Sequence, residues 1–111
     1  MKTLSYPEKL RIGPFDVKVT PMSGDLANAR NVFGMFGRDN NVISMDMSIT
    51  DPHRAVEVFL HEITHAIWMI YGIEEGDKEE RIVMAMGMAW TQIYRDNLEL
   101  LKWLSKNLKE K

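Results

Sequence analysis

Residues 59–68 read FLHEITHAIW, and the fold and function expected for the chain depend on this stretch. His61 and His65 are four positions apart, and Glu62 directly follows the first histidine. Four residues of an α-helix turn through about 400°, so the two imidazoles project from nearly the same side, one turn apart. Two imidazoles in this arrangement can bind one zinc ion, and the glutamate of an H-E-x-x-H helix deprotonates a zinc-bound water. The stretch therefore predicts His61 and His65 as metal ligands and Glu62 as the catalytic residue.

The surrounding helix strengthens this interpretation. H-E-x-x-H also occurs by chance, and two surface histidines beside a solvated glutamate are the plain alternative. Asp51 can cap a helix that begins at Pro52, and Gly72 can stop it after Tyr71. The motif then lies within one strongly amphipathic helix over 52–71, whose apolar face consists of Val56, Phe59, Leu60, Ile63, Ala66, Ile67 and Ile70.

A catalytic zinc ion needs a third protein ligand and an open position for water. The metzincin extension would require Gly at position 68 and His at position 71, and the chain has Trp68 and Tyr71 there. His53, the third histidine of the chain, lies two turns before His61 and cannot share the ion. A carboxylate from another element is therefore expected as the third ligand.

The second helix, expected over 77–95, offers two such carboxylates. A short loop joins it to the motif helix, so the two helices should pack antiparallel and bring Glu79 and Glu80 back towards the histidines. Glu79 aligns with the apolar stripe of this helix, and Glu80 lies on its flank. Each has an alternative role, because Glu80 can form a capping box with Asp77 and Glu79 can favour the helix N-terminus. Periodicity alone leaves both ligands open.

The rest of the chain predicts an α+β fold in a single domain over residues 1–111. The first half has alternating apolar residues and turn signals, and the second half has helical periodicity. On one expected strand, Ile43, Met45, Met47 and Ile49 point to one face. The expected elements before and after the motif helix are two short strands over 9–20, the second ended by Pro21, a short helix within 22–31 with Asp25 near its start, a strand and turn over 33–41, a strand over 41–49, the helix over 77–95 and a third helix from about residue 97.

Composition excludes several classes of protein. The 111 residues carry a net charge of −2, which gives no reason to expect a nucleic-acid partner. The absence of cysteine rules out disulfides and thiolate zinc sites. There is no run of 18 apolar residues to span a membrane and no apolar leader in the first ten residues, so a cytoplasmic protein is expected.

Three stretches together resemble the ImmA/IrrE-type metallopeptidases, and most closely the small versions carried by phages and prophages. They are FLHEITHAIW, EERIVMAMGMAWTQIYRDN over 79–97 and the upstream FGMFGRDNNVISMDMSI over 33–49. The resemblance covers roughly residues 9–98 and implies a minimal zincin-like domain, in which a small twisted sheet packs on the HExxH helix and two further helices follow. It implies one zinc ion per chain held by His61, His65 and Glu80, although Met84 and Met86 stand where larger members have an Asn-containing signature.

Two functions follow from these expectations. The first is a zinc metallopeptidase of peptide or protein substrates, acting in the host cytoplasm if the chain is phage-encoded. An edge strand near Val42–Met47 could pair with the substrate. The candidates for stabilising the oxyanion are Tyr71, Tyr94, His53 and Arg54, although a structural or surface role is favoured for each of them. The alternative is a zinc-stabilised phage protein that binds a partner without cutting it. The intact Glu62 favours the enzyme, because a purely structural site has no need of that carboxylate.

Overall fold

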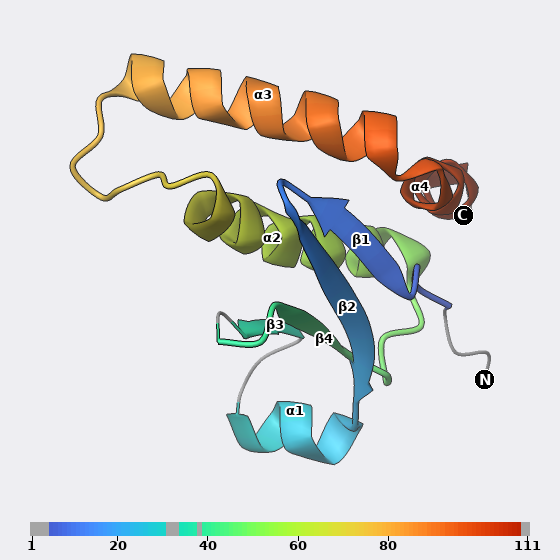
Figure 1. Cartoon of the computed structure of the whole chain (residues 1–111). Helices are drawn as coiled ribbons and strands as arrows, with labels where there is room; N and C mark the ends of the chain where they lie inside the picture. Colours follow the sequence, from blue (N-terminus) through green and yellow to red (C-terminus); the bar gives the residue numbers. More distant parts are fainter. Residues whose placement is uncertain (1–4, 31–33, 38, 110–111) are drawn as a thin grey trace.

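The expected α+β class is confirmed by the computed structural model, which describes residues 5–30, 34–37 and 39–109. Figure 1 shows the sheet on one side of the motif helix and the C-terminal helices that follow it in the chain. The elements in these residues are β1 (Lys9–Ile12), β2 (Phe15–Met22), α1 (Gly24–Arg30), β3 (Gly34–Gly37), β4 (Val42–Asp46), α2 (Pro52–Ile70), α3 (Glu79–Asp96) and α4 (Leu98–Lys109).

The sheet has the strand order β1-β2-β4-β3. β1 and β2 form an antiparallel hairpin, β2 and β4 are parallel, and β3 pairs antiparallel with β4. The expectation that the strand near Val42–Met47 is an edge strand is therefore wrong, since β4 has a neighbour on each side. Among the strands of the described residues, the edge on this side of the sheet is β3, which pairs with β4 alone.

Pro21 was expected to end the second strand, but β2 continues through it to Met22. The Val19 N–H bonds to the carbonyl of Glu8, on the side of β1. The backbone nitrogen of Pro21, two residues further along β2, points to the same side. It lies beyond the Lys9–Lys18 pair, where the pairing of β1 with β2 stops. A proline costs no ladder hydrogen bond at such a position, so β2 can keep pairing with β4 on its other side.

The core lies between the sheet and the apolar face of α2, and buried residues of α3 and α4 extend it. Five of the seven residues predicted for this face are buried, and Leu60 and Ile70 are half-buried against the core. Ile43 and Met45 meet it from β4, whereas Met47, predicted to point inward, is exposed. β4 ends before Met47, because the Asp46 carboxylate accepts hydrogen bonds from the backbone and hydroxyl of Ser48 and turns the chain.

α2 begins and ends as its terminal residues predict. The Asp51 carboxylate accepts a hydrogen bond from the His53 N–H, Pro52 is the first helical residue, and Gly72 follows the end with a φ of 69°. This left-handed conformation favours glycine, so Gly72 stops the helix. Neither α2 nor any other helix of the described residues is long and apolar enough to cross a membrane.

α3 does not begin with the expected capping box. Its N-cap residue is Lys78, which makes no side-chain capping bond. The Asp77 carboxylate instead accepts from the Glu74 N–H at 2.7 Å and pairs with Arg81 at 3.4 Å. Asp77 therefore closes the loop between α2 and α3, and Glu80 has no capping role with it.

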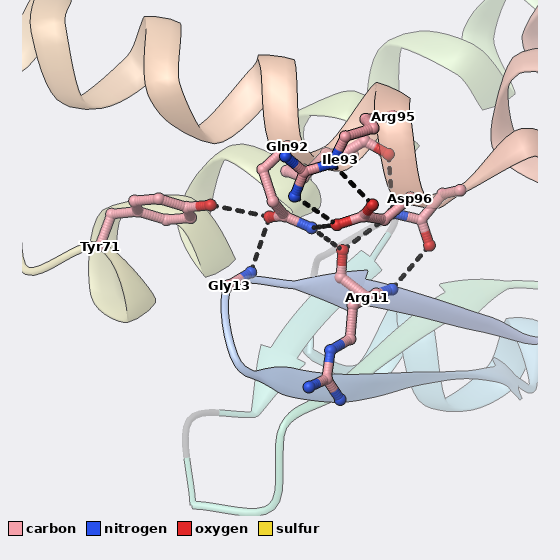
Figure 2. A network of polar contacts seen from close by, with 8 residues as sticks. Arg11, Gly13, Tyr71, Gln92, Ile93, Arg95 and Asp96 are labelled. Carbon is pink, nitrogen blue, oxygen red and sulfur yellow. Dashed lines mark hydrogen bonds and ion pairs between the residues drawn. The ribbon is translucent and has the colours of Figure 1, made fainter.

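α3 makes its main contacts with β1 and α4, whereas α2 was expected from the sequence to be its main neighbour. The tip of the β1–β2 hairpin lies between the two helices (Figure 2). Gly13 at this tip donates its N–H to the Gln92 side chain on α3, and a Cβ added to it would lie 2.8 Å from Ile70 on α2. Because the φ of Gly13 is also 57°, only glycine fits this wedge without strain.

A polar network joins the hairpin to α3. The Gln92 amide oxygen accepts from the Gly13 N–H and the Tyr71 hydroxyl, both at 2.7 Å, and its NH₂ group donates to the Arg11 carbonyl and the Asp96 carboxylate. Asn97 continues the network, since its side chain bonds both backbone groups of Arg11. The Arg-Asp-Asn sequence at the end of α3 thus has a structural use in this fold.

We expect Gln92→Ala to lower the free energy of unfolding by about 2–3 kcal/mol, because it leaves the Gly13 N–H without its acceptor and removes one of the two donors to the Arg11 carbonyl. Tyr71→Phe removes one bond of the same amide and should cost about 1 kcal/mol. Urea unfolding followed by circular dichroism measures both. Equal losses in the two variants would show that the hairpin is not held by this amide.

Candidate functional site

The two motif histidines lie together on the exposed side of α2. Their Nε2 atoms are 3.2 Å apart, and their rings meet edge to face with centroids 4.7 Å apart. Two nitrogens bound to one tetrahedral zinc at about 2.0–2.1 Å would be separated by about 3.3 Å. The pair therefore already has the spacing that a shared metal ion requires.

Glu62 lies beneath this pair and is buried, with 6% of its surface exposed. Its carboxylate is 4.0 Å from Nε2 of His61. A Cβ added to Gly34 of β3 would lie 3.1 Å from Cγ of Glu62 and 3.2 Å from the side chains of Met45 and Val58. The glutamate is thus held between α2 and the edge strand, and Gly34 leaves the room that it needs.

Burial raises the pKa of Glu62 above the ordinary value of a glutamate, because the charged form is poorly solvated there. The positive forms of His61 and His65 act in the opposite direction and lower this pKa. The pKa of Glu62 is raised overall. This buried carboxyl group is therefore shifted towards accepting a proton, as a general base does.

The histidines and Glu62 open into a groove of about 690 Å³ between α2 and β3. The strand edge forms one wall, and the last turns of α2 with the loop after it form the floor and the end. Aromatic and apolar side chains supply most of the lining, and Glu74 supplies a second carboxylate. The lining residues are Gly34, Met35, Phe36, His61, Glu62, His65, Trp68, Met69, Gly72, Ile73 and Glu74.

The assembled zinc site predicted from the sequence is not formed. Within residues 5–30, 34–37 and 39–109, no group of three or more His, Cys, Asp or Glu side chains is arranged to hold a metal ion. The expectation of a metal-binding group made by His61, His65 and Glu80, and with it the description of the chain as a zinc hydrolase with a formed three-ligand centre, is therefore corrected. The role of each of these residues by itself stays a prediction.

The orientation of α3 explains this correction. Ala85, Ala89 and Ile93 form its buried stripe. Glu80 precedes Ala85 by five residues, which places it about 140° around the helix from that residue. Glu79 and Glu80 are both exposed in the first turn of α3.

The residues considered for oxyanion stabilisation have other partners. The Tyr71 hydroxyl donates to Gln92, and Tyr94 stacks on Trp90 with ring centroids 5.4 Å apart. His53 lies in the first turn of α2, about two turns before His61, and its Nε2 is 3.3 Å from the Leu108 carbonyl. Arg54 pairs with Glu57. None of the four lines the groove, so this expectation finds no support.

Sequence reasoning missed several groove residues. Gly34 and Phe36 come from β3, which was expected only as part of a strand and turn. Trp68 was used only to exclude the metzincin pattern, although it lies one turn after His65 and so on the same side of α2. Glu74, in the loop after α2, also lines the groove and was not among the carboxylates expected at the site.

Comparison of the chain with family models, curated proteins and solved structures gives no match. The resemblance to ImmA/IrrE-type metallopeptidases therefore stays a prediction from the quoted motifs. The feature of the groove that bears on function is its geometry, with two histidine nitrogens 3.2 Å apart over a buried glutamate beside a strand edge.

Proposed function

We propose that the groove binds an extended peptide and hydrolyses it with Glu62 as general base, in a zincin-like peptidase of the ImmA/IrrE type. The observation that carries the proposal is the buried carboxylate of Glu62, 4.0 Å from His61 at the bottom of an open groove. A buried acid costs free energy unless it has a task or a partner, and the sites of general bases are where such costs are found. The surface histidine pair above it is the second support.

The histidine pair has the spacing to hold one divalent ion such as Zn²⁺. His61 and His65 would supply two imidazole nitrogens, which are ligands that zinc prefers. Such an ion, when bound, polarises a carbonyl oxygen and makes water more acidic. Two protein ligands are assigned to the ion, because the described residues form no three-ligand group.

The remaining steps belong to residues of the chain. Glu62 lies next to the histidines and can accept a proton from water and pass it to the leaving amine. Its burial under Gly34 fixes the carboxylate against the strand edge. The outer edge of β3 can pair with an extended peptide backbone, and Phe36 and Trp68 offer apolar contact to side chains of that peptide.

A second candidate function is peptide binding without cleavage. The observation that favours it is that the described residues contain no three-ligand metal group. A groove with an aromatic lining and a strand edge along one wall can bind a peptide by itself. The two functions differ in whether the peptide is cut and in whether the histidines are needed for binding it.

The test is a titration of the whole chain with Zn²⁺, alongside incubation with a broad peptide library. Wild type should bind about one ion per chain, and His61→Ala or His65→Ala should weaken that binding by about tenfold or more, because each removes one of two nitrogen ligands. His53→Ala, at the other end of α2, is the matched control and should bind as wild type does. Library cleavage by wild type that is lost in both motif variants supports the peptidase.

Unchanged zinc binding in both motif variants would overturn the role of the histidine pair. Peptide binding without cleavage, at saturating zinc, would replace the peptidase by the binding module. Because zinc that binds only the folded chain adds stability by mass action, the melting temperature of wild type should also rise with zinc.

A further inference from the structure

α3 has an apolar face that no other element of the described chain covers. Val83, Met84 and Met88 are 57%, 61% and 62% exposed, and all three lie within two turns. Met84, Val83 and Met88 lie about 140°, 120° and 100° around the helix from Ala89, the middle of the buried stripe of Ala85, Ala89 and Ile93. In Figure 1, α3 runs along the upper edge of the molecule with nothing beyond it. We call Val83, Met84, Gly87, Met88 and Thr91 the outer face of α3.

This face is hollowed. Its five residues line a shallow groove of about 580 Å³ together with Tyr71, Gln92 and Arg95. Single exposed apolar residues are ordinary on a protein surface, but a contiguous apolar patch with a polar rim is typical of an interaction site. The shape and composition of the outer face therefore fit a protein partner.

Gly87 lies at the middle of the outer face. A Cβ added to it would have no atom within 4 Å, so the fold of the single chain gives no steric reason for glycine there. Glycine within a helix is less favourable than alanine, because it loses more backbone freedom on folding. A second helix that crosses at Gly87 could approach the backbone of α3 closely, because no side chain stands in the way there. The Met88 side chain of the second helix could then pack over Gly87.

The charged residues along α3 favour a second copy of α3 as the partner, in an antiparallel orientation. Glu79 and Glu80 lie eight and seven residues before Gly87, and Tyr94 and Arg95 lie seven and eight residues after it. When two copies of α3 cross antiparallel at Gly87, the acidic end of each copy meets the Tyr94–Arg95 end of the other. A parallel crossing would place the glutamates of both copies together, which is unfavourable.

We propose that two copies of this chain associate through the outer face of α3, in an antiparallel two-fold dimer that crosses at Gly87. Arg95 already bonds Asp96 through Nε and one terminal nitrogen, at 2.8 and 3.0 Å. A guanidinium has five N–H donors, so three remain for the acidic residues of the other copy. The contact is self-complementary, as the interface of a two-fold dimer must be.

The dimer should be weak. One crossing of two helices covers less surface than the roughly 1,200–2,000 Å² of a stable complex, so a dissociation constant in the micromolar range is expected. Sedimentation equilibrium of the full chain, from about 1 μM to about 1 mM, covers this range. The mass of wild type should rise from 12.9 kDa towards twice that value.

Met88→Lys should keep the chain at 12.9 kDa over the whole range, because it places a charge at the crossing point. Glu75→Lys makes a charge change on an exposed loop residue outside the outer face and should dimerise as wild type does. Since Met88 and Glu75 are both exposed, circular dichroism should report an unchanged fold. Wild type that stays monomeric at the highest concentration, or Met88→Lys that dimerises as wild type does, would overturn the proposal.

A charge exchange tests the antiparallel direction. The double variant Glu79→Lys/Glu80→Lys should not self-associate, and neither should Arg95→Glu, because each places like charges at both ends of the crossing. In a mixture of the two variants, the introduced lysines meet the introduced glutamate at one end, and the native glutamates meet Arg95 at the other, so the mixture should dimerise. Dimers in each variant alone, without any gain on mixing, would rule out this arrangement.

Discussion

Glu62→Gln should reduce peptide hydrolysis by about 10²–10⁴-fold, the usual effect of removing a general base, and should leave the fold and zinc binding in place. Glutamine has nearly the shape of glutamate, so it fits the space between α2 and Gly34 and can still donate a hydrogen bond to water. It cannot accept the proton that the reaction must remove. The rate therefore falls, while the groove keeps its form.

The matched control is Glu74→Gln, which removes a carboxylate from the same groove at an exposed position. The rate of this variant should stay within a few-fold of wild type, because Glu74 is outside the histidine motif. Zinc content, melting temperature and cleavage of a broad peptide library are compared for the three proteins. Equal cleavage by wild type and Glu62→Gln would remove Glu62 from the mechanism, and loss of activity in Glu74→Gln alone would transfer the role to Glu74.

What the sequence predicts best is local in the chain. The motif helix begins at Pro52 and ends before Gly72 because capping and stop signals lie within a few residues of each end. The spacing of His61 and His65 follows from one turn of that helix, so their closeness needed no tertiary information. The apolar face of α2 is also local, since its 3.6-residue period is set by the helix itself.

What the sequence did not predict depends on pairs of residues far apart. The edge strand is β3 and not β4, because β2 pairs in parallel with β4 after a crossover through α1. The position of α3 is decided by the hairpin tip, where Gly13 meets both Ile70 and Gln92. A short loop between two helices suggests direct antiparallel packing, and nothing near that loop reveals that a hairpin from the start of the chain will lie between them.

The candidate site divides in the same way. The histidine pair and Glu62 come from one helix and were predicted together. The wall of the groove comes from Gly34 and Phe36, and its end from Glu74, which reach the site only through the folded sheet and loop. A third ligand from α3 needed a correct rotation and position of a second helix, and both depend on its contacts with β1 and α4.

Phe59→Ala should lower the free energy of unfolding by about 3–5 kcal/mol, which is a large part of the roughly 5–15 kcal/mol typical of a small domain. Phe59 is fully buried on α2, and its ring lies 5.4 Å from Tyr6 and 5.1 Å from Trp103, which are 5.2 Å from each other. The three rings join α2 to α4 and to the segment before β1. Trp103 also donates its indole N–H to the Ser5 carbonyl, so the segment and α4 are held at the same place.

Removing the Phe59 ring leaves a cavity that neither Tyr6 nor Trp103 can fill without losing its contact with the other. The loss of folding free energy therefore exceeds the free energy of transferring the removed atoms from water to the core. Phe59→Leu keeps most of the volume and should cost about 1–1.5 kcal/mol. Urea unfolding by circular dichroism compares the two variants with wild type, with the slope of the transition as a check on two-state behaviour. A loss below about 1 kcal/mol in Phe59→Ala would mean that the aromatic cluster does not hold α4 against the motif helix. Because Phe59 precedes His61 by two residues on the opposite side of α2, Phe59→Leu should lower stability without changing zinc binding at the histidine pair.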